Sequence, residues 1–265
     1  MTDLFLFTGQ SNMQGQTGVL PSPNEPAYKS REYRLLTDTL VPLCHPAGEN
    51  LTADGQPGNC DLSDTLLAAW QGCGSLPPYF CDTYAKASGQ EVVAVHAAKG
   101  STTIAYWQKG GEAYALLTRK FLAAEKAIGK ENVRRRYAVF LQGESDAIES
   151  RTQQEYETLL STFIKDLKQD IAIDAFFIIR VARFTEDERD FPILRAQEAV
   201  AARGEAVMLT RISGALLLQP EKYQSYERAH YNNEAFAVLG KTAGENAAAY
   251  DQGKPFFAGE EPYNL

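Results

Sequence analysis

Short apolar runs alternate with longer amphipathic stretches along this chain of 265 residues. The apolar runs are continuous and rich in β-branched or aromatic residues, which is typical of strands buried on both faces. They cover residues 4–7, 92–97, 137–141, 176–181 and 207–210. The amphipathic stretches predict helices over residues 112–128, 152–170, 191–202 and 234–250. This alternation predicts an α/β, three-layer, doubly wound fold built on a five-stranded parallel sheet.

One long segment interrupts the alternation. Residues from about 15 to 74 are rich in proline, glycine, asparagine and aspartate, and they predict a long loop insertion. A loop of this length inside a compact domain is usually functional or acts as a lid. Because nothing in the chain resembles a linker, we predict a single domain over residues 1–265.

Charge and composition exclude several classes of function. The chain carries 26 basic and 34 acidic residues, for a net charge of −8, so a nucleic-acid partner is not expected. No run approaches the roughly 20 apolar residues of a membrane helix, and the first residues do not form a secretory signal. We therefore expect no membrane association and a cytoplasmic location. Without an H-E-x-x-H motif or a His/Cys cluster, neither a metal nor another cofactor is expected.

Polar turns that contain glycine follow the first three predicted strands, at residues 8–15, 98–103 and 142–146. In an open parallel sheet, ligands bind at the carboxyl ends of the strands, so these turns converge on one edge. A serine there supplies an attacking oxygen, and main-chain N–H groups or side-chain amides hold an oxyanion. The turns therefore favour an acyl-transfer site.

A serine nucleophile needs a base, and the chain has three histidines. His96 lies within a predicted strand and is interpreted as a core histidine. His45 lies beside Pro46 in the long loop, where surface and substrate-contact roles both stay open. His230 precedes the last helix, so it is either an ordinary loop histidine or a general base delivered onto the strand ends.

Ser11 lies in the first of these turns and is the main candidate for the nucleophile. Two other serines compete with it for this role. Ser145 lies in G-E-S-D-A, which loosely matches the nucleophile elbow of α/β-hydrolases. Its neighbours Glu144 and Asp146 would place two carboxylates beside a developing negative charge, which argues against this alternative. Ser101 fits better in a loop that donates main-chain N–H groups.

The order of these motifs resembles the SGNH hydrolases, and most closely their branch of sialate O-acetylesterases and acetyl xylan esterases. That branch is marked by G-Q-S-N-M, then G-x-T/S-x-I-x-x-W, then Q-G-E-S-D, and a late histidine. Here the blocks are G-Q-S-N-M at residues 9–13, K-G-S-T-T-I-A-Y-W at 99–107, Q-G-E-S-D at 142–146, and His230. They span nearly the whole chain in the right order, and the resemblance implies a flavodoxin-like SGNH hydrolase fold.

The resemblance implies a role for each matched residue. Ser11 becomes the nucleophile and His230 its base, while the Ser11 N–H, the Gly100 N–H and the Gln142 side-chain amide form the oxyanion hole. Many SGNH enzymes place asparagine where this branch places glutamine, and both carry the same amide donor. Residues assigned to substrate binding are Gln10, Asn12, Ser101 and Trp107; Trp107 either stacks against a sugar ring or is an ordinary packed aromatic.

The acid that orients His230 stays open between two glutamates. Many SGNH enzymes carry aspartate three residues before the histidine, and this chain has Glu227 there. Glu144 is the rival, since some acetyl xylan esterases use the glutamate of Q-G-E-S-D. We assign Glu227 as the orienting acid and give Glu144 a structural or partner role within the site.

These assignments predict a serine esterase that hydrolyses O-acetyl esters on a carbohydrate through an acetyl-enzyme intermediate. The expected partner is an acetylated sugar or oligosaccharide, and the sequence assigns no oligomeric state. The alternative is a non-catalytic carbohydrate-binding protein on the same fold, because a fold alone does not establish an activity. A nucleotide binder is disfavoured, since no G-x-G-x-x-G or P-loop follows any predicted strand.

Overall fold

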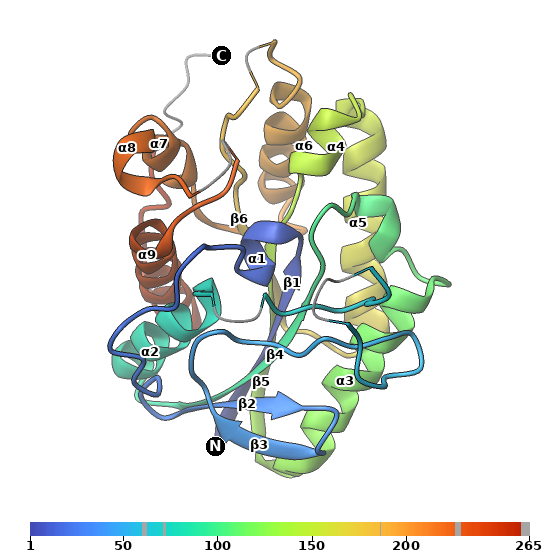
Figure 1. Ribbon diagram of the computed structural model, residues 1–265, viewed down its shortest axis with the longest axis vertical. Helices are drawn as coiled ribbons and strands as arrows, with labels where there is room; N and C mark the ends of the chain where they lie inside the picture. Colours follow the sequence, from blue (N-terminus) through green and yellow to red (C-terminus); the bar gives the residue numbers. More distant parts are fainter. Residues whose placement is uncertain (60–62, 71–72, 186, 226–228, 261–265) are drawn as a thin grey trace.

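The protein is built around one seven-stranded sheet (Figure 1). The computed structural model describes residues 1–59, 63–70, 73–185, 187–225 and 229–260. The strand order is β3-β2-β4-β1-β5-β6-β7. The strands are β1 (Thr2–Gly9), β2 (Ser30–Arg34), β3 (Thr39–Pro42), β4 (Glu91–Ala98), β5 (Val133–Leu141), β6 (Ala175–Ile179) and β7 (Val207–Thr210).

Helices cover both faces of the sheet and give the expected three layers. The longer ones are α2 (Leu76–Ser88), α3 (Glu112–Ile128), α5 (Gln153–Asp170), α6 (Phe191–Ala202) and α9 (Asn233–Asp251). Helices α2 and α9 pack together on one face, whereas α3, α5 and α6 lie on the other (Figure 1). The short helices are α1 (Ser11–Gln14), α4 (Glu144–Ile148), α7 (Ser213–Leu217), α8 (Pro220–Tyr223), and the 3₁₀ turns η1 (Ile104–Trp107) and η2 (Lys130–Asn132).

All five predicted strands belong to the sheet, but the sheet has two strands more than the five that the sequence predicts. Strand β2 pairs in parallel with β4, and β3 pairs antiparallel with β2. Both fall in the segment that was predicted to be a loop. Strand β2 reads S-R-E-Y-R, so its charges hide it from a search for apolar runs. Its Glu32 is buried because it pairs with Arg34 at 2.8 Å and accepts the Gly48 N–H at 2.6 Å.

The helix predictions agree closely with the structure. Helices α3 and α6 have the predicted bounds, and α5 begins after Thr152, whose side chain forms the reciprocal capping box with Glu155. Helix α2 has no counterpart among the predicted helices. It opens with Leu-Pro-Pro, and prolines fit only the first turn of a helix, where no N–H is required.

The register of the central strands sets the position of the site. Strand β1 is buried along its whole length between β4 and β5. Gly9 at its end pairs with Ala98 of β4 and with Leu141 of β5. The three strands therefore end at one level, and the turns that follow them meet above the centre of the sheet.

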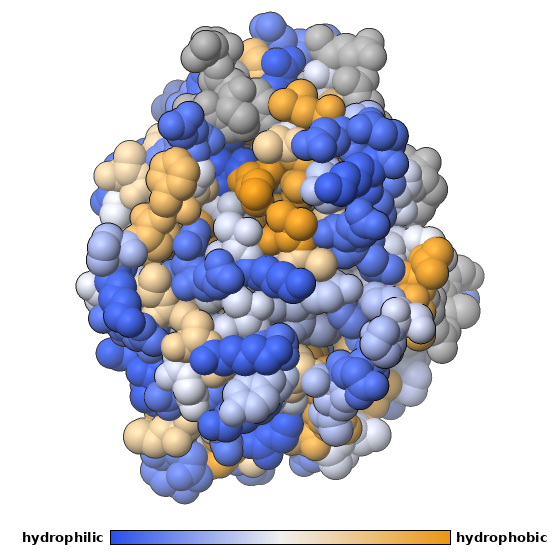
Figure 2. Space-filling view, turned by 90° about the vertical axis from the view of Figure 1, so that its left-hand side faces the viewer, coloured by the Kyte–Doolittle hydropathy of each residue, from blue (hydrophilic) through white to orange (hydrophobic). Residues whose placement is uncertain are grey.

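The surface on the side of α2 and α9 is mainly hydrophilic, with an apolar area in its upper half (Figure 2). Exposed apolar side chains elsewhere in the described chain are scattered, as is usual for globular proteins. Within the described residues, no helix is both long enough and apolar enough to cross a membrane.

Candidate active site

The turn after β1 requires glycine at its first position. Gly9 has a φ of +145°, and a Cβ atom there would lie 2.0 Å from the Leu141 carbonyl oxygen. The Gln10 N–H then donates to that same oxygen at 3.1 Å. Strand β1 is thus tied to the end of β5 just before α1 begins, and this places Ser11 at the amino end of α1.

Ser11 lies against the turn that follows β4. A Cβ atom built on Gly100 would lie 3.4 Å from the Ser11 Cβ, so a side chain at position 100 would contact Ser11. The Gly100 N–H donates to the Gln14 Oε1 at 2.6 Å. The structure therefore brings Ser11 and Gly100 together, as the sequence predicts, and it places an amide carbonyl on the Gly100 donor.

The end of the chain reaches this turn through Asn12. Its Nδ2 donates to the Ala229 carbonyl at 2.8 Å, and its Oδ1 accepts the Tyr231 N–H at 3.2 Å. Ala229 and Tyr231 are the two neighbours of His230, whose side chain is itself buried. The residue next to Ser11 thus holds the main chain on both sides of the predicted base.

Gln142 joins the site from the end of β5. Its Nε2 has three acceptors, namely Asp146 Oδ2 at 2.6 Å, the Thr102 carbonyl at 3.0 Å and Gln10 Oε1 at 3.2 Å. Its Oε1 accepts the Tyr156 hydroxyl at 2.9 Å. These contacts fix which end of the amide is the donor, and they point it toward the loop that carries Gly100.

Of the two glutamates that are candidates for the orienting acid, the structure describes only Glu144. Glu144 is buried, and its Oε1 accepts a hydrogen bond from Asn12 Nδ2 at 2.7 Å. Burial raises the pKa of the Glu144 carboxyl, and the Asn12 hydrogen bond acts in the opposite direction. Glu227, the acid assigned from the spacing to His230, lies outside the described residues.

Most residues predicted to bind substrate are buried in the structure. Asn12 makes the contacts given above, and Gln10 Oε1 accepts the Ser145 N–H at 3.1 Å. Trp107 is 0% exposed, and its Nε1 donates to Thr102 Oγ1 at 3.2 Å. This favours the packed-aromatic interpretation of Trp107 over stacking on a sugar. Ser101 alone among the four is exposed, with a φ of +59°.

The other two histidines have structural contacts. His96 is a core histidine as predicted, with Nε2 3.0 Å from the Met13 carbonyl oxygen, and burial lowers its pKa to about 3. His45 Nδ1 accepts the Ser75 N–H at 3.1 Å, and burial lowers its pKa to about 4. Both rings are therefore neutral near pH 7 and are engaged with main-chain groups.

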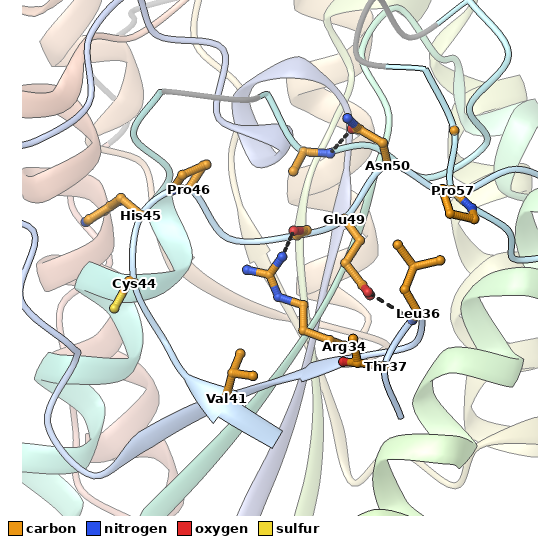
Figure 3. Close-up of a pocket in the computed structure, with 13 residues that line it drawn as sticks. Arg34, Leu36, Thr37, Val41, Cys44, His45, Pro46, Glu49, Asn50 and Pro57 are labelled. Carbon is orange, nitrogen blue, oxygen red and sulfur yellow. Dashed lines mark hydrogen bonds between the residues drawn. The ribbon is translucent and has the colours of Figure 1, made fainter. Parts of the chain in front are cut away.

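An open cavity of about 760 Å³ lies beside the β2–β3 hairpin and the loop of residues 44–58 (Figure 3). Its two charged side chains, Arg34 and Glu49, each make hydrogen bonds within the protein. Arg34 donates to the Gly48 carbonyl at 2.5 Å, and Glu49 accepts the Leu36 N–H at 3.0 Å. We therefore assign no chemistry to this cavity. Within the described ranges, no group of three or more His, Cys, Asp or Glu side chains is placed to hold a metal ion.

Sequence reasoning assigned no site role to two residues that support the site. Gln14 accepts the hydrogen bond from the Gly100 N–H. Its position three residues after Ser11 does not predict this contact. Asp146 accepts from Gln142 and also from the Ile104 N–H at 2.8 Å. Gln142 precedes helix α4 rather than lying in it, so their spacing in the sequence gives no helical signal of this contact.

A family model for carbohydrate esterases, described as sialic acid-specific acetylesterase, matches residues 1–249. The chain belongs to this family. It is therefore a carbohydrate acetylesterase, as its motifs predict. The order of its motifs, the mainly parallel sheet and the position of Ser11, Gly100 and Gln142 just after three adjacent strands all agree with this membership.

Individual proteins similar to this carbohydrate esterase share its fold at low sequence identity. A probable carbohydrate esterase of Arabidopsis thaliana is 25% identical over 187 residues, which are 68% of each chain. A solved structure from Arabidopsis thaliana aligns with a TM-score of 0.68 and 19% identity, covering 94% of this chain and 98% of that one. NanS aligns with a TM-score of 0.66 and 12% identity, covering 95% and 98%.

Proposed function

We propose that Ser11 is the nucleophile and His230 the general base of this carbohydrate acetylesterase. The observation that carries the proposal is that Asn12 donates a hydrogen bond to the Ala229 carbonyl and accepts one from the Tyr231 N–H, on either side of His230. These hydrogen bonds join segments more than 200 residues apart at the amino end of α1. A serine at a strand-to-helix turn beside a loop histidine is the arrangement that serine esterases require.

In the first half of the reaction, the Ser11 hydroxyl attacks the acetyl carbonyl carbon while His230 takes its proton. The bond from the carbonyl carbon to the sugar oxygen then breaks, and His230 returns the proton to that oxygen. This step releases the free sugar and leaves acetyl-Ser11. In the second half, water attacks the acetyl-enzyme with His230 again as base, and acetate leaves from the restored serine.

The proposed oxyanion hole is formed by the Ser11 N–H, the Gly100 N–H and Gln142 Nε2. In the free protein Gln142 Nε2 is shared among three acceptors, so Gln142 donates to the oxyanion only by releasing one of these contacts. The Gln14 carbonyl oxygen, 2.6 Å from the Gly100 nitrogen, stands where an acyl oxygen would accept the same hydrogen bond. The substrate carbonyl therefore replaces Gln14 at this donor as the negative charge develops. Each such donor typically contributes about 3 kcal/mol of transition-state stabilisation.

We propose Glu227 as the carboxylate that orients the His230 ring, and we place Glu144 in the buried layer beneath Asn12. Among the residues predicted to bind substrate, Ser101 is the one we retain for direct contact, because it is exposed beside the Gly100 donor. The substrate is an acetylated sugar or oligosaccharide. The cytoplasmic location stays a prediction from the sequence.

An ester panel tests the proposed function. Acetyl, butyryl and longer-chain esters are compared with acetylated xylose and acetylated sialic acid, and acetate release is followed for the wild type and for Ser11→Ala. We expect hydrolysis of at least one acetylated sugar, with no acetate release above background from the variant. A folded wild-type protein that binds acetylated sugars but releases no acetate would support the non-catalytic alternative instead.

A further inference from the structure

The side chain of Asn12 is committed to protein contacts. It is 1% exposed, both of its N–H groups have acceptors, and its oxygen has a donor. The acceptors are the Glu144 carboxylate at 2.7 Å and the Ala229 carbonyl at 2.8 Å, and the donor is the Tyr231 N–H. No donor of Asn12 is left for a substrate, which argues against its predicted role in substrate binding.

These partners also fix the orientation of the amide. If the Asn12 amide were reversed, its oxygen would face two acceptors, Glu144 Oε1 and the Ala229 carbonyl. Its NH₂ group would meanwhile face the Tyr231 N–H, so every contact would become repulsive. The carboxylate of Glu144 therefore selects the amide orientation in which Asn12 forms hydrogen bonds with both neighbours of His230.

Glu144 is buried rather than exposed at the surface, and its carboxyl contacts the side chain of Asn12. It is 4% exposed, and among the described residues its Oε2 has no hydrogen-bond partner. When the Glu144 carboxyl is ionised, its Oε1 contact with Asn12 is a charge-assisted hydrogen bond, which is stronger than a neutral one and strengthens further in a buried site.

We propose that Asn12 is a positioning residue that holds His230 over Ser11, and that Glu144 acts on the reaction through Asn12. The proposal rests on the proposed roles of Ser11 and His230. Both neighbours of His230 are hydrogen-bonded to the Asn12 side chain, which belongs to α1. The position of the His230 ring therefore depends on the position of α1. A misplacement of about 1 Å in such a site lowers turnover by about 100-fold.

A double-mutant cycle tests this relay. Asn12→Ala, Glu144→Ala and the double variant are compared for kcat and KM on an acetyl ester that the wild type hydrolyses. We expect Asn12→Ala to lower kcat by about 100-fold while KM changes by less than about threefold. If Glu144 acts through Asn12, removing it from the Asn12→Ala protein lowers kcat by no more than about twofold further.

Two further variants separate positioning from simple loss of stability. Asn246→Ala is the matched control, because Asn246 Nδ2 also donates to two main-chain carbonyls, of Leu209 at 2.7 Å and Phe257 at 3.1 Å. We expect it to lower Tm about as much as Asn12→Ala without the loss of kcat. Glu144→Gln keeps an oxygen acceptor for Asn12 and should recover at least about tenfold of the kcat lost in Glu144→Ala.

The proposal is wrong if the two single losses of kcat multiply in the double variant, or if Glu144→Gln is as slow as Glu144→Ala. The second result would mean that the glutamate charge acts on the reaction directly. If Asn12→Ala does not fold, Asn12→Ser takes its place in the cycle.

A readout without activity keeps this test separate from the proposed function. The His230 ring is followed by NMR in the wild type, Asn12→Ala and Asn246→Ala, with its signals assigned by their loss in His230→Ala. We expect them to shift or broaden in the Asn12 variant alone. Unchanged His230 signals in that variant would overturn the positioning role, whereas a wild type that hydrolyses no ester would overturn only the proposed function.

Discussion

The side-chain carbonyl of Gln14 accepts a hydrogen bond from the Gly100 N–H, with 2.6 Å between oxygen and nitrogen. Gln14 is fully buried at the end of α1, so this contact is shielded from water. The contact means that the donors of the proposed oxyanion hole are not all unpaired in the free protein. The Gly100 donor is already paired with the Gln14 carbonyl, and the Gln142 donor with the carbonyl oxygens of Gln10 and Thr102.

Replacing Gln14 with methionine should therefore help catalysis. Gln14→Met keeps the length of the side chain and removes the carbonyl that competes for the Gly100 N–H. A single neutral hydrogen bond contributes about 1 kcal/mol, so we expect kcat/KM to rise by about threefold to tenfold. Steady-state kinetics on an acetyl ester measures this. A tenfold fall would show instead that Gln14 positions the Gly100 turn rather than covering its donor.

Loss of the Gln142 amide should be costly in the transition state. Gln142→Leu removes a proposed oxyanion donor, and we expect kcat to fall by about 100-fold to 1,000-fold with little change in KM. Gln108→Leu is the control, since Gln108 Nε2 also donates to two main-chain carbonyls, of Ile104 at 2.9 Å and Leu159 at 3.2 Å. Equal losses of kcat in the two variants would contradict a role for Gln142 in the oxyanion hole.

The proposed orienting acid gives a prediction that separates activity from stability. Glu227→Ala should lower turnover by at least about tenfold, because the His230 ring loses the group that selects its tautomer. If the carboxylate serves only the reaction, its Tm should change by less than about 2 °C, which corresponds to about 0.5 kcal/mol for a chain of this size. Parallel kinetics and thermal melts measure both effects. Wild-type turnover in this variant would contradict the assignment. The orienting acid would then be Glu144, or the site would work as a Ser–His dyad that has no orienting acid.

Glu144 should make the stability of the protein depend on pH. Burial raises the pKa of its carboxyl, so there is a pH range above its ordinary pKa in which the folded state keeps the proton and the unfolded state has lost it. The folded state then binds more protons, and stability falls as the pH rises through that range. Glu144→Gln does not titrate, so its Tm relative to the wild type should rise between pH 4.5 and pH 8. A constant or falling difference would mean that this pKa is not raised.

The parts of the fold that follow apolar periodicity were predictable from the sequence. Strand β7 and helices α3 and α6 have the predicted bounds, because each buries a continuous or regularly spaced apolar set. Strand β2 was not predictable in this way, since Glu32 is buried through an ion pair with Arg34. Three of the five residues of β2 are charged, so the strand leaves no apolar run in the sequence.

The candidate site was predictable as far as its motifs reach. Ser11, Gly100 and Gln142 follow strands that end at one level, so their proximity follows from the parallel sheet. The contact between Asn12 and Ala229 joins residues 217 positions apart, and no spacing rule predicts such a contact. The burial of Trp107 was also open, because an aromatic residue after a loop suits a core as well as a sugar site.

The site of covalent labelling by a fluorophosphonate probe tests the central claim most directly. The probe is applied to the wild type, Ser11→Ala and Ser145→Ala, and the labelled peptide is located by mass spectrometry. Our account predicts one adduct on Ser11, retained in Ser145→Ala and lost in Ser11→Ala while that variant stays folded. An adduct on Ser145, or labelling that persists without Ser11, would contradict it.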